Sequence, residues 1–309
     1  MTLNTAVDRS YVVGGFHAGG VYRSTEYWVG AGGKGINVAR VLRALGGEAL
    51  VLGLAGGPSG NLVSACLDGE GIPYELVPVS GETRVCITVA DPEAGVQTVI
   101  NEAGPEVRAE ESAAFLGSAR GLYRRLEPGS LVALAGSIPR GDTAGLYPSL
   151  VCLAREQGLR SVLDASGEPL VAGAEARPWM LKCNAQEWVA LEGCCPATPA
   201  DAVAAARARL GGGTQWVVIT LGSVGAVLVG ADEAWFASPP KVVTRNAVGS
   251  GDSFLAGLLW SWERGDSPAD SLAWGVAAGA ANAEVWAAGG CRGERVQELR
   301  SAVTVVGLP

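Results

Sequence analysis

The sequence predicts an α/β fold: a mostly parallel central sheet flanked by helices in three layers, plus a small second sheet. From about residue 34 the chain alternates continuous apolar runs with amphipathic helical segments. Continuous apolar runs are typical of parallel strands that are buried on both faces. Two other regions alternate apolar and polar residues instead. With 309 residues, 48% of them hydrophobic and 17% charged, the chain can form one large domain, and global disorder is excluded.

The spacing of apolar residues predicts the elements of the main domain. In the first helical segment, Ile36, Ala39 and Leu42 recur at the three-residue spacing that places them on one face. The predicted order is helix 36–45, strand 49–55, helix 59–69, strand 131–135, helix 143–157, strands 161–163, 179–181, 216–221 and 226–229, and finally helices 251–264 and 268–288. Helices between successive strands provide the crossovers that a parallel sheet requires.

The second sheet is predicted from three segments that alternate along the chain. Segments 21–29, 84–90 and 96–101 alternate, and residues 91–95 form a turn between the last two. Alternation fits strands with two unlike faces. We expect this sheet to project from the main domain as a lid or an association surface; a plain hairpin is the alternative.

Composition excludes several functional classes. A formal charge of −8 argues against general affinity for nucleic acid or an anionic membrane. His17 is the only histidine, which argues against a His-rich metal site or a Ser-His-Asp triad. The seven cysteines form no CxxC pair, so we expect buried free thiols in a reducing compartment. Without a signal peptide or a membrane-spanning run, the expected location is the cytoplasm.

A glycine-rich turn at residues 30–35 precedes the first predicted helix. It matches G-x-G-x-x-G through Gly30, Gly32 and Gly35, but no carboxylate ends the next strand, so the dinucleotide interpretation fails. Gly35 also follows Lys34 where a P-loop needs Ser or Thr. The remaining interpretation is a helix start whose amides bind hydroxyls or phosphate oxygens, with Lys34 and Asn37 on the first turn. A solvated helix start is the alternative.

The turn at residues 246–254 gives the sharpest chemical signal. Gly249, Ser250 and Gly251 let several amides point at one spot, where the helix dipole adds positive charge. Asp252 follows in the first helical turn. A capping carboxylate would explain Asp252 alone, but a base beside an anion hole explains the whole group, and phosphoryl transfer needs that combination.

A third candidate group follows the strand at 179–181. Asn184 and Glu187 have the spacing of a capping box, which is one interpretation. The alternative is a ligand site at the carboxyl edge of the sheet, where Lys182 suits a phosphate and Glu187 suits Mg²⁺. Lysine occurs only at positions 34, 182 and 241 beside 20 arginines, which indicates a need for a compact ammonium group at these positions; chance is the alternative interpretation.

Taken in order, these motifs resemble the PfkB carbohydrate kinases, a family with the ribokinase-like fold, and in particular its 1-phosphofructokinase and tagatose-6-phosphate kinase branch. The segments that carry the resemblance are 2–9, 32–39, 81–84, 136–139, 182–187 and 249–253. The chain departs from the branch at Thr5 and Cys183, where proline is common, and at Ala247, where Thr or Ser is frequent.

The resemblance implies a role for each matching residue. Asp252 would be the base that activates the acceptor hydroxyl, and the amides of Gly249, Ser250, Gly251 and Asp252 would form the anion hole. The implied sugar-phosphate site is Asp8, Gly32, Gly33, Lys34, Asn37, Arg84, Ser137 and Arg140. The implied nucleotide site is Lys182, Asn184, Thr220, Gly222, Gly225 and Asn282, with Asn184 and Glu187 organising Mg²⁺.

The resemblance also implies a single ribokinase-like domain over residues 1–309, with a β lid inserted at about 9–31 and 83–102, and a homodimer formed through the lid. The implied reaction is ATP- and Mg²⁺-dependent phosphorylation of a sugar phosphate, with fructose 1-phosphate, tagatose 6-phosphate and fructose 6-phosphate as candidates. An unphosphorylated sugar, a nucleoside, or a non-catalytic sensor of sugar phosphates remain alternatives.

Overall fold

The computed structural model describes residues 1–24 and 26–309. The strands are β1 (Ala6–Val12), β2 (Glu26–Gly32), β3 (Val51–Ala55), β4 (Tyr74–Pro78), β5 (Arg84–Asp91), β6 (Val96–Asn101), β7 (Glu106–Val107), β8 (Leu131–Ala135), β9 (Arg140–Gly141), β10 (Arg160–Asp164), β11 (Met180–Asn184), β12 (Trp216–Thr220), β13 (Ala226–Val229), β14 (Ala234–Ser238) and β15 (Thr304–Leu308). The helices are α1 (Lys34–Ala44), α2 (Gly57–Glu70), α3 (Ala109–Tyr123), α4 (Leu146–Glu156), α5 (Gly167–Glu175), α6 (Ala185–Glu192), α7 (Pro199–Arg207), the short 3₁₀ helix η1 (Gly222–Val224), α8 (Ser250–Glu263), α9 (Pro268–Ala283) and α10 (Gly293–Arg300).

The main sheet has seven strands in the order β15-β14-β13-β12-β11-β10-β8. The strands β8, β10, β11 and β12 are parallel, whereas β13, β14 and β15 pair antiparallel at one edge. The parallel pair β3–β4 joins the other edge through the first residues of the chain: Thr2 bridges to Gly53, and Ala135 donates to the carbonyl of Met1 at 3.1 Å. The predicted α/β fold with a largely parallel sheet is confirmed.

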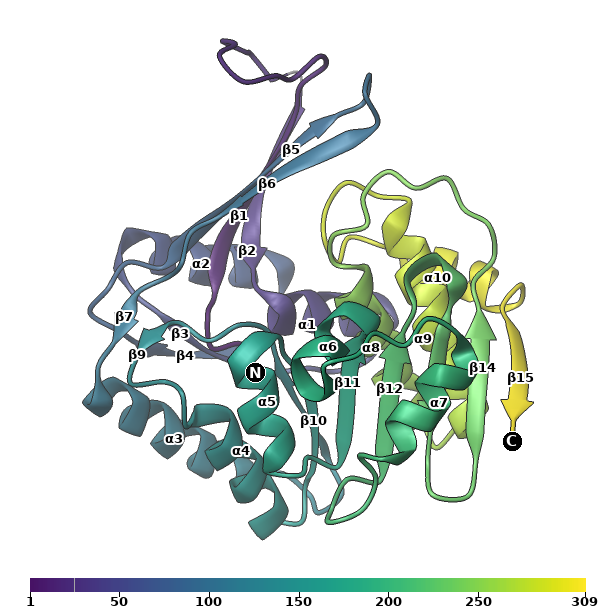
Figure 1. Cartoon of the computed structure of the whole chain (residues 1–309). Coiled ribbons are helices and arrows are strands. Elements are labelled where there is room, and N and C mark those ends of the chain that lie inside the picture. Colours follow the sequence, from purple (N-terminus) through teal and green to yellow (C-terminus); the bar gives the residue numbers. More distant parts are fainter. Residues whose placement is uncertain (25) are drawn as a thin grey trace.

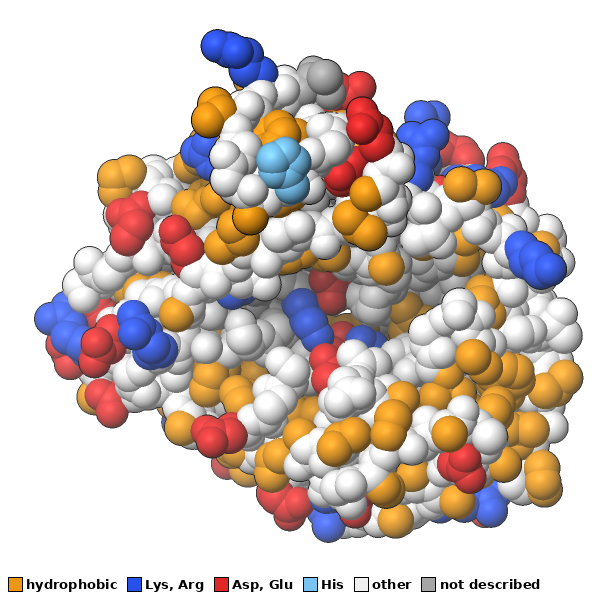
Figure 2. Space-filling model, turned by 45° about the horizontal axis from the view of Figure 1, so that its top comes forward, with side chains coloured by type: hydrophobic (Ala, Val, Ile, Leu, Met, Phe, Trp, Pro, Cys, Tyr) orange, Lys and Arg blue, Asp and Glu red, His pale blue; other side chains and the backbone are white. Residues whose placement is uncertain are grey.

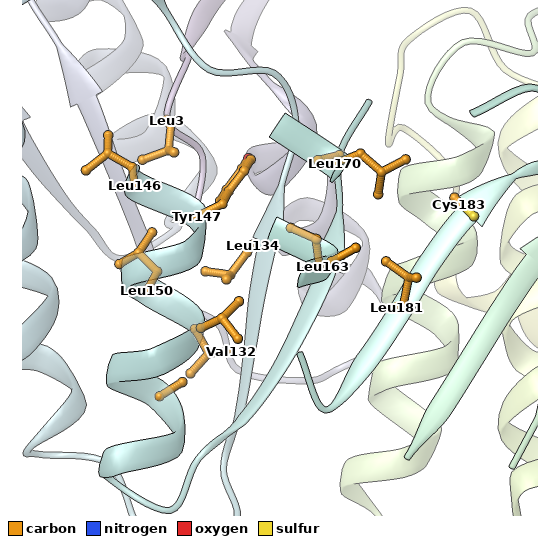
Figure 3. Packing of buried hydrophobic residues seen from close by; sticks show 14 of the residues in the cluster. Leu3, Val132, Leu134, Leu146, Tyr147, Leu150, Leu163, Leu170, Leu181 and Cys183 are labelled. Atoms are coloured by element: carbon orange, nitrogen blue, oxygen red, sulfur yellow. The ribbon is translucent and has the colours of Figure 1, made fainter. Parts of the chain in front are cut away.

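Helices cover both faces of the main sheet (Figure 1), which gives the predicted three layers. Successive strand residues point to opposite faces. Leu163 and Leu181 therefore pack with α4 and α5 (Figure 3), whereas Val162 and Met180 pack with α8 and α9. The strands are apolar on both sides for this reason.

The second sheet projects above the main domain as a lid (Figure 1), with the order β2-β1-β5-β6. The predicted strands at 84–90 and 96–101 are confirmed as β5 and β6. The prediction for 21–29 holds only from Glu26, because Val21–Ser24 form no strand; Thr25 lies outside the described residues. The apolar pattern did not predict β1, whose sequence AVDRSYV carries Asp8 and Arg9 at its centre.

The last predicted helix ends five residues early. The structure ends α9 at Ala283, because the carbonyl of Ala283 accepts the backbone N–H groups of Arg245 (2.7 Å) and Asn246 (3.1 Å). Residues 284–288 form turns instead. This contact ties α9 to the loop that leads into α8.

All seven cysteines are free thiols, as predicted, but Cys152, Cys194 and Cys195 are exposed rather than buried. Among the described residues, no helix is both long and apolar enough to cross a membrane.

Candidate active site

A cleft of about 1320 Å³ lies between the lid and the carboxyl edge of the main sheet. Figure 2 shows the hollow beneath the lid, with basic and acidic side chains at its floor. The predicted site residues that line it are Asp8, Lys34, Asn37, Arg84, Lys182, Asn184, Glu187, Thr220, Gly222, Gly225, Gly249, Ser250, Gly251 and Asp252. The structure therefore brings most of the predicted residues into one space.

Asp164 is a buried carboxylate that holds two lysines at the centre of the cleft. It ends β10; its Oδ2 accepts from Lys182 Nζ at 2.7 Å and its Oδ1 accepts from Lys34 Nζ at 3.0 Å. Burial alone would raise the pKa of Asp164, but the two ammonium groups outweigh burial and hold the pKa below its ordinary value. The carboxylate is thus charged and fixes the positions of both ammonium groups.

Lys34 is held more tightly than the sequence suggests. Besides Asp164, its Nζ lies 3.5 Å from Glu187 Oε1. Burial tends to lower the pKa of Lys34, but the carboxylates of Asp164, Asp252 and Glu187 together raise it. Lys34 is therefore permanently charged and belongs to the centre of the cleft.

Asp252 lies in the first turn of α8 and is only 6% exposed. Its Oδ2 accepts a hydrogen bond from Asn37 Nδ2 at 2.8 Å. Burial raises the pKa of Asp252 to about 6, with the Asp164 charge adding to the rise, whereas Lys34, the Asn37 hydrogen bond and Lys182 oppose it. At neutral pH the carboxylate is mostly ionised and is close to the protonation range that suits a general base.

The turn before α8 has the conformation that its glycines predict. Gly249 is left-handed with φ 81°, and a Cβ there would lie 2.7 Å from the Ala288 Cβ. The N–H of Ser250 donates to the carbonyl of Ala247 at 3.1 Å. The expected anion hole of four amides is therefore smaller by one, since the Ser250 amide is already used.

The next two amides are free to bind an anion. Within the described part of the chain, the N–H groups of Gly251 and Asp252 have no acceptor. They open a helix of 14 residues, so the helix dipole adds positive charge at the same place. A Cβ on Gly251 would lie 3.2 Å from Lys182 Nζ, so the ammonium group stands beside these amides.

Asn184 and Glu187 form the predicted capping box and also line the cleft. Glu187 Oε2 accepts from the Asn184 N–H at 2.8 Å, and Asn184 Oδ1 accepts from the Glu187 N–H at 2.7 Å. The capping-box interpretation is confirmed, and the cap fixes the Glu187 carboxylate, whose other oxygen lies near Lys34. Within residues 1–24 and 26–309, no group of three or more His, Cys, Asp or Glu side chains is placed to hold a metal ion.

The lid side of the cleft contains Asp8 and Arg84. A Cβ on Gly32 would lie 2.2 Å from the Asp8 carboxylate, so this glycine leaves room for the acid. Burial raises the pKa of Asp8, although the charges of Arg40 and Arg84 oppose the rise. Arg84 Nε donates to the carbonyl of Asn4 at 3.2 Å, which positions the guanidinium at the base of β5.

The predicted site residues that do not line the cleft include Ser137, Gly33 and Arg140. Ser137 is bonded to the same Asn4. The Asn4 Nδ2 donates to Ser137 Oγ at 3.2 Å, so Ser137 lies just behind the lid side. Gly33 starts α1 with φ 112° and gives its carbonyl to the Asn37 N–H, which makes it a helix cap. Arg140 is exposed on β9 and is not brought to the cleft.

Asn282, predicted near a nucleotide, does not itself line the cleft, although Ala280 and Ala283 do. It is 0% exposed, its Oδ1 accepts from the Gly289 N–H at 2.8 Å, and its Nδ2 donates to the Val248 carbonyl at 2.9 Å and to Ser250 Oγ at 3.3 Å. Both ends of the amide are used within the protein. Asn282 therefore holds the turn before α8 in place.

Asp164 was not predicted as a site residue from the sequence. A signal was present, because Asp164 directly follows the predicted strand 161–163, as Lys182 follows the neighbouring strand 179–181. The carboxyl ends of parallel strands lie at one edge of a sheet, where ligands bind. The two ion pairs of Asp164 join it to lysines that are 18 and 130 positions away in the sequence, and no local pattern encodes such contacts.

Comparison with known proteins agrees with this geometry. A model of the pfkB family carbohydrate kinases matches residues 2–292. The chain belongs to this family. It is 32% identical over 283 residues to a 1-phosphofructokinase of Bacillus subtilis, covering 92% of this chain and 91% of that protein. It is also 32% identical over 261 residues to a tagatose-6-phosphate kinase of Staphylococcus epidermidis, covering 84% and 83% of the two chains.

Solved structures resemble this pfkB kinase over nearly its whole length. Phosphofructokinase-2 from Escherichia coli, solved with substrates and products, has a TM-score of 0.90 and 28% identity, covering 97% of each chain. A possible 1-phosphofructokinase from Thermotoga maritima shares the fold, with a TM-score of 0.85 at 24% identity over 100% of this chain and 98% of that one. The protein is therefore a carbohydrate kinase, an enzyme that transfers a phosphoryl group to an alcohol.

Proposed function

We propose that this kinase transfers the γ-phosphate of ATP to a hydroxyl of a phosphorylated ketohexose, with Asp252 as the general base. The observation that carries the proposal is the shared position of three groups in one cleft: the buried Asp252 carboxylate, the free amides of Gly251 and Asp252, and the Lys182 ammonium. Phosphoryl transfer needs a base for the acceptor and fixed positive charge for the moving group.

In this proposal Asp252 takes the proton of the sugar hydroxyl while the hydroxyl oxygen forms its bond to the γ-phosphorus. The bond from the γ-phosphorus to the bridging oxygen breaks, and ADP leaves. Lys182 and the two amides stabilise the charge on the transferred group. Asp164 holds Lys182 in place through the 2.7 Å ion pair, so this positive charge is oriented before substrate binds.

The residues near the capping box fit magnesium bound together with a nucleotide. Magnesium takes hard oxygen donors, commonly one or two carboxylates plus substrate phosphates, and neutralises phosphate charge. Glu187 would hold the magnesium ion, directly or by way of a water molecule, with the oxygen that lies near Lys34. The Asn184 oxygen is occupied by the cap, so Asn184 orients Glu187. Thr220, Gly222 and Gly225 line the adjoining end of the cleft, which would hold the nucleotide.

The preference for a phosphorylated sugar rests on Arg84. The cations among the described lining residues are Lys34, Arg84, Lys182 and Lys241. Asp164 holds Lys34 and Lys182 on the main-domain side, whereas Arg84 is the lining cation on the lid strands, where it would meet an anionic sugar. The relatives named 1-phosphofructokinase and tagatose-6-phosphate kinase support the same substrate class.

An ADP-release screen over fructose 1-phosphate, tagatose 6-phosphate, fructose 6-phosphate and the free ketohexoses tests this function. We expect turnover with at least one of the three phosphates at a kcat/KM well above that of any free sugar. Equal or higher activity with a free sugar or a nucleoside would contradict the substrate class. ADP release with none of them would contradict the reaction.

We also propose that the outer face of the lid pairs with a second copy. Tyr27, Val96 and Ile100 are 73%, 56% and 56% exposed. Ile100 pairs with Ile87 in the sheet, and paired residues share a face. Their face is opposite to the one that carries Asp8 into the cleft, so a partner there would leave the cleft open.

Light scattering after size exclusion tests the pairing. We expect a dimer for the unmodified chain and for the control Leu50→Asp, which is 46% exposed outside the lid. Ile100→Asp should be monomeric, because an unpaired charge in an apolar interface is costly. A monomeric unmodified chain would refute the interface.

A further inference from the structure

Arg40 makes an unusually complete set of contacts behind the cleft. It lies on α1, one turn after Asn37, and its side chain is 14% exposed. Its guanidinium donates to both oxygens of Glu70 at 2.6 and 2.9 Å, to the Ala31 carbonyl at 2.7 Å, to Asn37 Oδ1 at 3.0 Å and to the Ala288 carbonyl at 3.2 Å. These contacts use all five donors of the guanidinium.

One of these contacts determines which way the Asn37 amide faces. A guanidinium can only donate, so Asn37 must turn its oxygen toward Arg40. The amide nitrogen then faces Asp252 and donates at 2.8 Å. The opposite orientation would place an NH₂ group against a cation and an oxygen against a carboxylate. Arg40 thereby selects the orientation that stabilises ionised Asp252.

A second contact reaches the turn that carries the free amides. The Ala288 carbonyl is bound by Arg40, and Ala288 packs directly against Gly249. The next residue, Gly289, donates to Asn282 Oδ1, and Asn282 holds the Val248 carbonyl. Residues 288–289 are therefore fixed between Arg40 on one side and the turn before α8 on the other.

We propose that Arg40 is a positioning residue for phosphoryl transfer: it orients Asn37 toward Asp252 and anchors Ala288 behind Gly249. The inference rests on the proposed role of Asp252 as the base. Other charged groups act on Asp252 from the elements around it, namely Lys34 on α1, Asp164 on β10 and Lys182 on β11. No hydrogen bond joins Arg40 to these three within the described residues, so the Asn37 amide is its specific connection to the base.

The pH dependence of kcat at saturating sugar phosphate, from pH 5 to 9, distinguishes positioning from simple stabilisation. We use kcat because the Arg40 charge also opposes the rise that burial causes in the pKa of Asp8 on the sugar side, which would affect kcat/KM. In Arg40→Met the Asn37 amide loses its orientation, and a carboxylate that loses a donor binds a proton more readily. We expect the acid limb to move up by about one pH unit, so that activity falls more at pH 6 than at pH 8. Arg40→Lys keeps one cationic donor and should show a smaller shift.

The matched control is Arg43→Met, which changes an exposed arginine on the same helix and should leave the acid limb in place. Thermal unfolding of each variant measures the structural effect separately. If Arg40→Met does not fold, Arg40→Gln also lacks the guanidinium and decides the question. A folded variant with reduced kcat and an unmoved acid limb would overturn the inference.

Asp252→Asn, measured in parallel, separates this inference from the proposed function. Loss of turnover in Asp252→Asn, together with an unmoved acid limb in the Arg40 variants, would support Asp252 as the base and contradict only the proposed role of Arg40. Near-normal turnover in Asp252→Asn would refute the base itself.

Discussion

The two walls of the cleft are held in different ways. On the main-domain side, Lys34 and Lys182 are fixed by the buried Asp164. On the lid side, the sheet is joined to the loop before α8 by a hydrogen bond from Gln97 Nε2 on β6 to the Arg245 carbonyl at 3.0 Å. In the proposed function, the reacting groups are therefore oriented by the main domain, whereas recognition of the sugar would depend on the position of the projecting sheet (Figure 1).

The main-domain wall should respond most strongly to the loss of its central charge. In Asp164→Asn two ammonium groups lose their counter-ion, and the Lys182 side chain is only 3% exposed. Breaking a buried ion pair from one side costs about 3–5 kcal/mol of the free energy of unfolding, measured by urea denaturation. The control Asp142→Asn, at an exposed position, should change it by less than about 0.5 kcal/mol. Equal stability in the two variants would contradict the account of this wall.

The root of the lid should show a smaller and more selective effect. Removing the Arg84 guanidinium deletes charge-assisted contacts worth about 1.5–3 kcal/mol, so Arg84→Ala should raise the KM for the sugar phosphate about 10- to 100-fold. The KM for ATP should stay near its original value. Arg140→Ala is the control, because Arg140 does not line the cleft. A larger effect of Arg140→Ala than of Arg84→Ala would reverse the assignment.

The smallest effect is expected where the lid meets the main domain across the cleft. Gln97→Leu removes a neutral hydrogen bond worth about 0.5–1.5 kcal/mol, so the KM for the sugar phosphate should rise about 2- to 10-fold. Gln297→Leu, the same change at an exposed position on α10 that does not line the cleft, serves as the control. Unchanged kinetics in Gln97→Leu would show that this bond does not hold the lid.

The groups that the sequence predicted are those encoded by local spacing. Gly249, Gly251 and Asp252 form a turn and a helix start within four residues, and Asn184 with Glu187 forms a capping box. These patterns depend on backbone conformation and helix termini, which neighbouring residues determine.

The remaining parts of the site depend on contacts between distant residues. Asp164 meets Lys34 across 130 positions, and Asn37 meets Asp252 across 215. The amide of Asn282 holds residues 248 and 289, a contact that depends on how the chain turns after the early end of α9. Strand order and loop paths determine such pairs, and a single sequence gives no direct signal of them.

The base assignment is tested most directly by Asp252→Asn, with kcat measured by ADP release and sugar-phosphate binding measured by calorimetry. The variant keeps the size of the side chain and the turn before α8. We predict that kcat falls about 10²- to 10⁴-fold while the sugar phosphate still binds. Turnover within a few-fold of the unmodified enzyme would contradict the assignment of Asp252 as the proton acceptor.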